Sequence, residues 1–151
     1  EKGKRDARQG REGRLVIPSA ILESALYVTD LAAAEAFYTD ILGLTLLGKV
    51  DGRHLFFRCG PAVLLVFNAE ATKTPPLPDA RLPVPPHGAV GEGHLCFAAT
   101  AAEIVAWKAH LRAKRIAIES EFEWPQGGRS IYIRDPSGNS IEFAEPRIWG
   151  L

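Results

Sequence analysis

The strongest constraint on how this chain folds is a segment that it contains twice. Residues 128–143 read GRSIYIRDPSGNSIEF, and they align without a gap with residues 52–67, which read GRHLFFRCGPAVLLVF. Both copies begin with Gly-Arg and continue with apolar residues at matching positions. A repeated supersecondary unit cannot bury its apolar face alone, so neighbouring copies pack together. The chain is therefore expected to fold as two similar units that share a core.

The repeat extends back from these segments and predicts the same order of elements in each unit. An apolar, strand-forming run comes first, at residues 22–28 in one unit and 94–99 in the other. An alanine-rich segment with the apolar spacing of a helix follows each run. Short strands are expected next, at residues 44–50 and 116–120, before the hairpins of the matched segments. Each unit thus reads as strand–helix–strand–strand–strand, which is an α+β fold.

Composition marks the boundaries of the units. The first residues are charged and almost free of apolar side chains, so burial there cannot offset the entropy of ordering. Prolines crowd the stretch between the units, which favours an extended arm. We expect a flexible tail at 1–19, a first βαβββ unit at 20–70, a proline-rich arm at 71–91, a second βαβββ unit at 92–146 and an extension at 147–151. The two repeats are expected to form a half-open mixed β-barrel cleft with its helices outside.

Charge and cysteine content argue against several classes of function. Lys and Arg number 18 and Asp and Glu number 18, so the formal net charge is zero. This balance argues against binding to nucleic acid or to a membrane surface through bulk charge. No apolar run approaches the ~20 residues that a membrane-spanning helix needs. Cys59 and Cys96 have no paired spacing, which favours a reduced, cytoplasmic protein without disulfides.

Side chains alternate along a strand, so the apolar pattern assigns each residue to one face of its sheet. In the second unit, the uniformly apolar positions that should cover the helix are Ile131, Ile133, Ile141 and Phe143. By the repeat, the helix side of the first unit takes Leu55, Phe57, Leu65 and Phe67. The opposite, open face then gathers Glu23, His54, Phe56, Arg58, His94, Ser130, Tyr132 and Glu142, together with Leu64 and Val66.

Two carboxylates and an imidazole on the open face indicate a metal site. Glu23 and His94 occupy the first position of the first strand in their units, and Glu142 lies on the last strand of the second. Carboxylates gathered in a cleft repel each other unless a cation neutralises them, and two Glu with a neutral His balance a divalent ion. This set of oxygen and nitrogen ligands suits Mn, Fe, Co, Ni or Zn. Three protein ligands leave positions open for water or substrate, as in catalytic sites.

The repeated βαβββ unit, closed by DPSGNSIEF, resembles the vicinal oxygen chelate superfamily over residues 21–146. That superfamily includes glyoxalase I, the fosfomycin-resistance and bleomycin-resistance proteins and the extradiol dioxygenases. The resemblance implies metal ligands at Glu23, His94 and Glu142. The fourth equivalent position, on the last strand of the first unit, is then Val66, which cannot bind metal. Glyoxalase I usually fills all four positions, and the fosfomycin-resistance enzymes fill these three but typically with His in place of Glu23.

The resemblance implies a metal-dependent enzyme that acts on a small oxygen-rich substrate. Isomerase or lyase chemistry and thiol addition both fit, through a metal-chelated enolate or oxyanion, with Glu142 as the catalytic proton carrier. The expected substrate-binding residues are His54, Phe56, Arg58, Trp124, Arg129, Ser130 and Tyr132. Superfamily members often form homodimers, in which Glu23 of one chain would meet His94 and Glu142 of the other.

Two other classes of function remain open. A metal-free binding protein, similar to the bleomycin-resistance proteins, would hold a flat aromatic ligand in an aromatic groove, and its binding would survive chelation. A structural module with a vestigial cleft would bind neither metal nor ligand.

Overall fold

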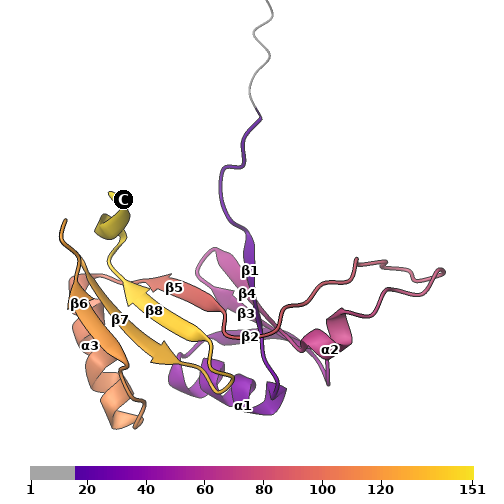
Figure 1. Cartoon of the computed structure of the whole chain (residues 1–151), viewed down its shortest axis with the longest axis horizontal. Coiled ribbons are helices and arrows are strands. Elements are labelled where there is room, and N and C mark those ends of the chain that lie inside the picture. The colour runs from indigo at the N-terminus through magenta and orange to yellow at the C-terminus, as the bar shows by residue number, and fades with distance from the viewer. Residues whose placement is uncertain (1–15) are drawn as a thin grey trace, which may run out of the picture.

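The computed structural model describes residues 16–151, so most of the tail expected at 1–19 lies outside the described residues. The chain forms two four-stranded sheets, and each has a helical segment on one face (Figure 1). The first unit consists of β1 (Glu23–Tyr27), α1 (Leu31–Ala36), η1 (Phe37–Ile41), β2 (Thr45–Val50), β3 (His54–Cys59) and β4 (Ala62–Phe67). The second consists of β5 (His94–Ala98), α3 (Ala101–Ala113), β6 (Ser120–Glu123), β7 (Arg129–Arg134) and β8 (Ser140–Ala144). The predicted α+β fold of two βαβββ units is confirmed.

The two sheets have the same topology. Their strand orders are β1-β4-β3-β2 and β5-β8-β7-β6. The first strand of each unit pairs in parallel with the last, and the remaining pairs are antiparallel, so both sheets are mixed. This pairing places the first and last strands of each unit side by side. Residues that are far apart in the sequence, such as His94 and Ser140, therefore become neighbours.

The helices form because their ends are capped and one side of each is apolar. Asp30 caps α1 by accepting a hydrogen bond from the backbone N–H of Ala33 at 3.0 Å. Thr100 and Glu103 form a capping box at the start of α3, with reciprocal bonds of 3.1 and 3.2 Å. The buried face of α3 joins the helix-side residues of its own sheet and the apolar residues of the first unit in one hydrophobic core. The two units therefore share a core, as the repeat predicts.

In β4, the last strand of the first unit, each side chain points to the opposite side of the sheet from the side predicted. Residues that lie directly opposite each other in an antiparallel pair share a face of the sheet. In β4, Leu64 and Val66 pair with the buried residues of β3 and are 2% and 0% exposed. Leu65 and Phe67 pair with β3 residues of the open face. The prediction that Leu64 and Val66 face the cleft, and that Leu65 and Phe67 face the helix, is wrong.

Hairpin turns of different length explain this error. Residues 60–61 join β3 to β4, whereas residues 135–139 join β7 to β8. The gapless alignment hides the resulting shift by one position, and such a shift moves every side chain of a strand to the other face. Leu65, rather than Val66, is therefore the structural equivalent of Glu142. Leu65 is also apolar, so this position still offers no metal ligand.

The strand expected at 116–120 is also misplaced, because β6 spans Ser120–Glu123. Ile116 and Ile118 pack against the core from the segment that joins α3 to β6. All four residues of β6 are exposed, since it is an edge strand that pairs only with β7. The apolar residues that suggested a strand at 116–120 belong to the connecting segment. The true strand, β6, lies at an exposed edge, so its sequence lacks the alternation of apolar and polar residues that would indicate a strand.

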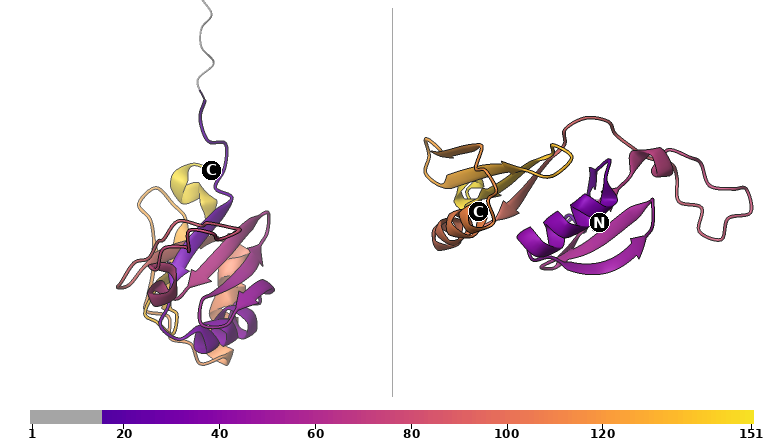
Figure 2. Two further views of the ribbon diagram at one scale, coloured as in Figure 1. Left: turned by 90° about the vertical axis from the view of Figure 1, so that its right-hand side faces the viewer. Right: turned by 90° about the horizontal axis from the view of Figure 1, so that it is seen from below.

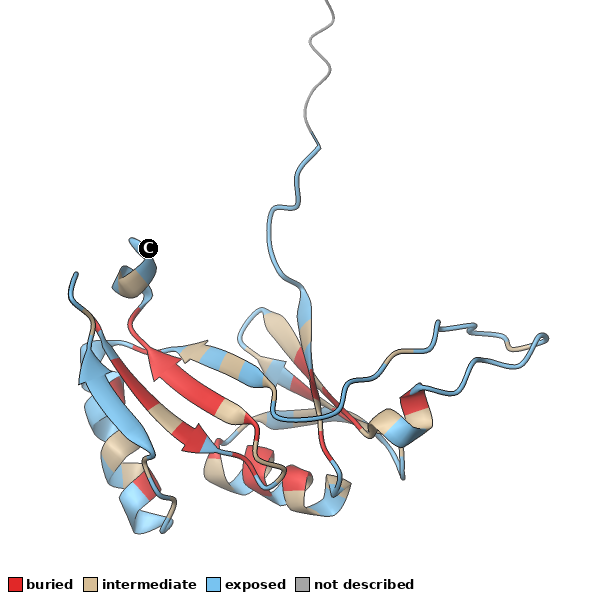
Figure 3. Cartoon of the chain, viewed as in Figure 1, coloured by how far each residue is buried: buried red, intermediate tan, exposed pale blue. Residues whose placement is uncertain are grey.

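Two segments leave the body of the molecule. After the short helix α2 (Ala69–Thr72), the proline-rich arm reaches away from both sheets (Figure 2). Most of this arm is exposed (Figure 3), including the apolar side chains of Leu77, Leu82 and Val90. Within residues 16–151, no helix is long and apolar enough to cross a membrane.

The chain ends in a short 3₁₀ turn, η2 (Pro146–Trp149), that is anchored to β7 by Glu145. The Glu145 carboxylate accepts a hydrogen bond from the backbone N–H of Arg129 at 2.6 Å and pairs with the guanidinium of Arg147 at 3.1 Å. These two interactions, the backbone bond first, lower the pKa of Glu145 below its usual value.

Candidate functional site

The open face of the second sheet brings together three of the predicted site residues. His94 is the first residue of β5, Glu142 lies in the middle of β8 and Tyr132 lies in β7, directly opposite Glu142. The Nε2 atom of His94 lies 3.2 Å from Oε2 of Glu142. The Tyr132 hydroxyl donates a hydrogen bond to Oε1 of Glu142 at 2.9 Å. Parallel pairing of β5 with β8 is what joins these residues across a long stretch of sequence.

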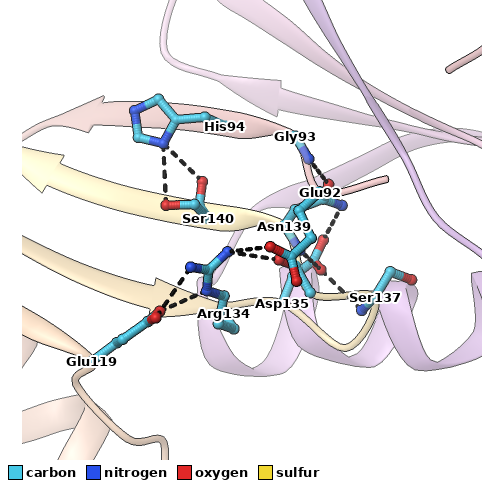
Figure 4. Close-up of polar contacts among 10 residues, drawn as sticks. Glu92, Gly93, His94, Glu119, Arg134, Asp135, Ser137, Asn139 and Ser140 are labelled. Atoms are coloured by element: carbon cyan, nitrogen blue, oxygen red, sulfur yellow. Dashed lines mark hydrogen bonds and ion pairs between the residues drawn. The ribbon is translucent and has the colours of Figure 1, made fainter. Parts of the chain in front are cut away.

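Both ring nitrogens of His94 lie beside oxygen atoms that accept hydrogen bonds. Its Nδ1 atom lies 3.1 Å from the backbone oxygen of Ser140 and 3.3 Å from the Ser140 hydroxyl (Figure 4). A carbonyl oxygen only accepts hydrogen bonds, so a neutral ring with its proton on Nδ1 satisfies Ser140 and leaves Nε2 without a proton. The lone pair of Nε2 then points at a carboxylate oxygen of Glu142. Either a proton or a cation must lie between these two atoms.

Glu142 is a buried carboxylate with few partners. Its side chain is only 8% exposed, whereas the side chain of His94 is 52% exposed. Burial, followed by the hydrogen bond to Glu142, raises the pKa of Tyr132 to about 12. Burial, followed by the negative charge of Glu142, raises the pKa of Cys96 to about 12 as well. Both groups stay protonated at neutral pH, so neither adds charge beside the carboxylate.

An aromatic wall extends the open face of the second sheet. Phe122 of β6 stacks on Tyr132 with ring centroids 5.7 Å apart, and its ring meets Trp124 edge-on at 4.9 Å. The indole N–H of Trp124 donates to the hydroxyl of Ser130 at 2.8 Å, and Ser130 is fully buried. Trp124 and Ser130 therefore lie together near Tyr132, whose hydroxyl contacts Glu142, and their role in binding substrate stays a prediction. Phe122 was not among the predicted site residues. The strand predicted at 116–120 ends before it, so the prediction assigned Phe122 to neither face of the sheet.

The open face of the first sheet carries a second aromatic cluster. The ring of His54 stacks on Phe56 with centroids 4.0 Å apart, and both rings meet Phe67 edge-on at 5.9 Å. Burial, and then the charge of Arg53, lowers the pKa of His54, which favours its neutral form. Phe67 was assigned to the wrong face, and only the pairing of β4 with β3 reveals its place.

One nitrogen of His54 lacks a protein partner. Its buried Nδ1 has no hydrogen-bond partner among the described residues. Arg58, farther along β3, is exposed and shares the face of His54 by strand alternation. The arm covers one side of this cluster, because Nδ1 of His87 lies 2.7 Å from the Tyr27 hydroxyl.

The third predicted metal ligand lies on the other sheet. Glu23 is the exposed first residue of β1, the position in the first unit that His94 holds in the second. Among residues 16–151, no three His, Cys, Asp or Glu side chains of one chain are grouped closely enough to hold a metal ion. One chain therefore brings together His94 and Glu142, and Glu23 does not join them.

The two arginines of β7 are held by ion pairs. Arg129 contacts Glu121 at 3.2 Å, and Glu121 also binds Lys108 of α3 at 2.6 Å, which places Arg129 on the helix side of the sheet. Arg134 contacts Glu119 at 2.6 Å and Glu92 at 3.3 Å. Of these two, Arg129 was a predicted substrate-binding residue, and its ion pair directs it away from Glu142.

Comparison with known proteins gives consistent matches. The family model described as the Glyoxalase/Bleomycin resistance protein/Dioxygenase superfamily matches residues 20–143. The chain is similar to the crystal structure of lactoylglutathione lyase from Agrobacterium tumefaciens, with 48% identity over 89% of this chain and 98% of that chain, and a TM-score of 0.83. A virulence protein from Salmonella typhimurium is 27% identical, over 86% of this chain and 98% of that chain, with a TM-score of 0.62. A protein from Nocardioides is 24% identical, over 87% of this chain and 86% of that chain, and its TM-score of 0.66 shows a shared fold. No curated protein sequence matches the chain.

Proposed function

The chain belongs to the glyoxalase/bleomycin resistance protein/dioxygenase superfamily, and we propose that it is a metal-dependent, glyoxalase-type enzyme that acts on a small substrate with two adjacent oxygen atoms. The observation that carries this proposal is the pair of atoms His94 Nε2 and Glu142 Oε2, 3.2 Å apart. In the tautomer whose Nδ1 proton is directed at Ser140, the two lone pairs face each other. A divalent cation satisfies both and neutralises the buried carboxylate.

The residues present fit such an ion. Imidazole nitrogen and carboxylate oxygen are ligands for Mn, Fe, Co, Ni and Zn. The bond from Nδ1 of His94 to a backbone carbonyl is the outer contact that metal-binding histidines make. The Tyr132 hydroxyl does the same for the carboxylate of Glu142. A bound ion would act as a Lewis acid that polarises the oxygens of the substrate.

The remaining chemistry belongs to the side chains of this site. Glu142 takes a proton from a carbon next to a substrate carbonyl and returns it to the neighbouring carbon, which makes the reaction an isomerisation or its lyase equivalent. Tyr132 holds the carboxylate in place through Oε1, so that Oε2 is the oxygen directed at His94 and at a bound ion. Phe122 and Trp124 form an aromatic wall next to Tyr132. Addition of a thiol to the substrate is the second reaction that this arrangement supports.

The similarity to lactoylglutathione lyase directs the choice of substrate. Thiol adducts of small α-oxo-aldehydes with glutathione are the first class to test, after loading the protein with each of Mn, Fe, Co, Ni and Zn in turn. Formation of a thioester, followed by its ultraviolet absorbance, should depend on metal. Glu142→Gln and His94→Gln should abolish it. Glu121→Gln, which removes a carboxylate bound to Lys108 on the other face, should not. A wild-type rate equal to the uncatalysed rate with every metal would refute the glyoxalase reaction.

We further propose that the site is completed by a second copy of this chain. Glu23 is exposed on the first sheet, and the described residues of one chain give the site only two ligands. Both sheets also present aromatic open faces, which two chains can bring together across a twofold axis. The exposed apolar side chains of the arm, Leu77, Leu82 and Val90, provide further contact area.

A mixing experiment distinguishes a shared site from a site within one chain. Chains with Glu23→Ala and chains with Glu142→Ala are each expected to be inactive. When the two are unfolded, mixed in equal amounts and refolded, half of the dimers are mixed and each mixed dimer has one intact site. The mixture should therefore recover about a quarter of the wild-type activity. No recovery, or a monomer at micromolar concentration by light scattering, would refute the shared site.

The stacked pair of His54 and Phe56, with Phe67 beside it, favours one alternative. Three aromatic rings on the open face of the first sheet suit a flat aromatic ligand, as in a metal-free binding protein of the bleomycin-resistance type. Calorimetric titration of a flat aromatic compound in the presence of a chelator tests this. Binding that chelation leaves unchanged and that Phe56→Ala removes would favour the binding protein over the enzyme.

A further inference from the structure

We propose that Asn139 is a positioning residue that sets the geometry of His94 through the backbone of Gly93. This inference rests on the proposed role of His94 as a metal ligand. Asn139 ends the turn DPSGN between β7 and β8, and it is 1% exposed. It is followed directly by Ser140, whose backbone and hydroxyl oxygens face Nδ1 of His94. The last residue of the turn and the first residue of β8 therefore contact Gly93 and the imidazole of His94 from the same side (Figure 4).

Both the oxygen and the nitrogen of the Asn139 side-chain amide form hydrogen bonds. Its oxygen accepts a bond from the backbone N–H of Gly93 at 2.7 Å. Its amide nitrogen donates to the backbone oxygen of Tyr27 at 3.0 Å and to Oδ2 of Asp135 at 2.9 Å. Because Gly93 offers a donor and Tyr27 an acceptor, only one orientation of the amide fits. Asn139 thus joins the start of β5 to the end of β1, and so one unit to the other.

The contact with Gly93 is close enough to control where His94 lies. A Cβ atom at position 93 would lie 3.1 Å from Oδ1 of Asn139 and 3.2 Å from Cδ2 of Leu26. The backbone oxygen of Gly93 also accepts a bond from the N–H of Ser140 at 2.9 Å. Gly93 is therefore held on both of its peptide groups by the residues that precede and begin β8. His94 follows Gly93 directly, so fixing the backbone of Gly93 also fixes where the backbone of His94 lies.

The other end of the same cluster does not touch β5. The Tyr38 hydroxyl donates to Oδ2 of Asp135 at 2.8 Å, and Tyr38 is fully buried in the π-helical turn η1. The Oδ1 atom of Asp135 accepts bonds from the backbone N–H groups of Ser137 and Asn139, both at 2.9 Å, which shapes the turn. Tyr38 therefore joins the two units without contacting the strand of His94. This separation provides a matched control.

The experiment compares Asn139→Ala with Tyr38→Phe in the full chain. Each variant removes hydrogen bonds from one buried cluster, so each should lower the melting temperature. Two readouts then separate positioning from stability: the dissociation constant for Zn²⁺ or Ni²⁺, by competition with a chromophoric chelator, and the tautomer of His94 in the metal-free protein, from its ring ¹⁵N chemical shifts. The second readout does not depend on any metal, so it decides the role of Asn139 even if the proposed enzyme activity fails.

Asn139→Ala should weaken metal binding, by no more than the about 10–100-fold that loss of a direct partner of a metal ligand causes, because Asn139 acts through Gly93, and it should reduce the fraction of His94 with its proton on Nδ1. Tyr38→Phe should leave both readouts unchanged. Equal effects of the two variants, or an unchanged tautomer in Asn139→Ala, would overturn the proposal. If Asn139→Ala does not fold, Gly93→Ala replaces it, since the added methyl displaces the same contact. An unchanged tautomer and affinity in Gly93→Ala would also overturn it.

Discussion

Replacing Tyr132 with phenylalanine is expected to weaken the binding of a divalent ion while leaving the fold intact. The variant removes one hydroxyl, which donates to Oε1 of Glu142 at 2.9 Å. The ring remains, so its stacking on Phe122 at 5.7 Å and its contact with the ring of His94 at 6.3 Å are retained. Any change in affinity therefore reports on the orientation of the carboxylate of Glu142.

The size of this change follows from two independent estimates. A hydrogen bond to a charged group contributes about 1.5–3 kcal/mol. Loss of an outer partner of a metal ligand typically lowers affinity about 10–100-fold, which corresponds to about 1.4–2.7 kcal/mol. The two ranges overlap, so the dissociation constant of Tyr132→Phe for Zn²⁺ or Ni²⁺ should rise by at least about tenfold. Competition with a chromophoric chelator measures it.

Tyr27→Phe is the matched control for this prediction. It also removes one hydroxyl from an open face, where the partner is Nδ1 of His87 at 2.7 Å rather than a carboxylate. The affinity of Tyr27→Phe should stay within about twofold of the wild type, because no proposed ligand loses a contact. If Tyr132→Phe also stays within this limit, then the orientation of Glu142 does not matter for the metal, and the reasoning is refuted.

Three further predictions test the fold and the charges around the site. Leu64→Ala should lower the free energy of unfolding by about 2–5 kcal/mol, and Leu65→Ala by clearly less, because only Leu64 lies on the buried face of β4. Urea denaturation measures both losses, and equal losses would contradict the register of β4. Since its native contacts lower the pKa of Glu145, that carboxylate stabilises the fold above the unfolded pKa of about 4.5 and loses this contribution as the pH falls through the lower folded pKa. Glu145→Gln should therefore destabilise the protein at pH 7 and show a shallower loss of stability below about pH 5, and identical pH profiles would contradict this. Cys96, with its pKa raised to about 12 by burial and a neighbouring carboxylate, should react with a disulfide reagent at pH 8 more slowly than the same residue in the unfolded chain, and equal rates would contradict that pKa.

The sequence predicted the fold class because its signals repeat. The two matched segments, the helical spacing before them and the capping box of α3 all agree, and local signals that agree with one another specify a fold. What it could not predict was the register of β4. Leu64, Leu65 and Val66 are all apolar, so strand alternation leaves no trace in this run, and the shorter turn at residues 60–61 is invisible to a gapless alignment.

The candidate site was predictable where polar residues interrupt apolar strands. His94 and Glu142 stand out for this reason, and the structure places them 3.2 Å apart. Phe122 and Phe67 did not stand out, because an aromatic residue on a strand reads equally well as core. The distance between Glu23 and the other two predicted ligands could not be predicted from strand patterns. These patterns assign side chains to faces within one unit, and they give no information on how two sheets, or two chains, are placed relative to each other.

The metal content of the protein tests the central claim most directly. Elemental mass spectrometry of the purified, untagged chain, with Glu142→Ala beside it, should find about one divalent ion per wild-type chain and almost none in the variant. This result would establish the site of His94 and Glu142 and justify the search for glyoxalase-type substrates. No bound metal in either protein, even after reconstitution with Mn, Ni and Zn, would contradict the account and direct attention to the binding of aromatic ligands.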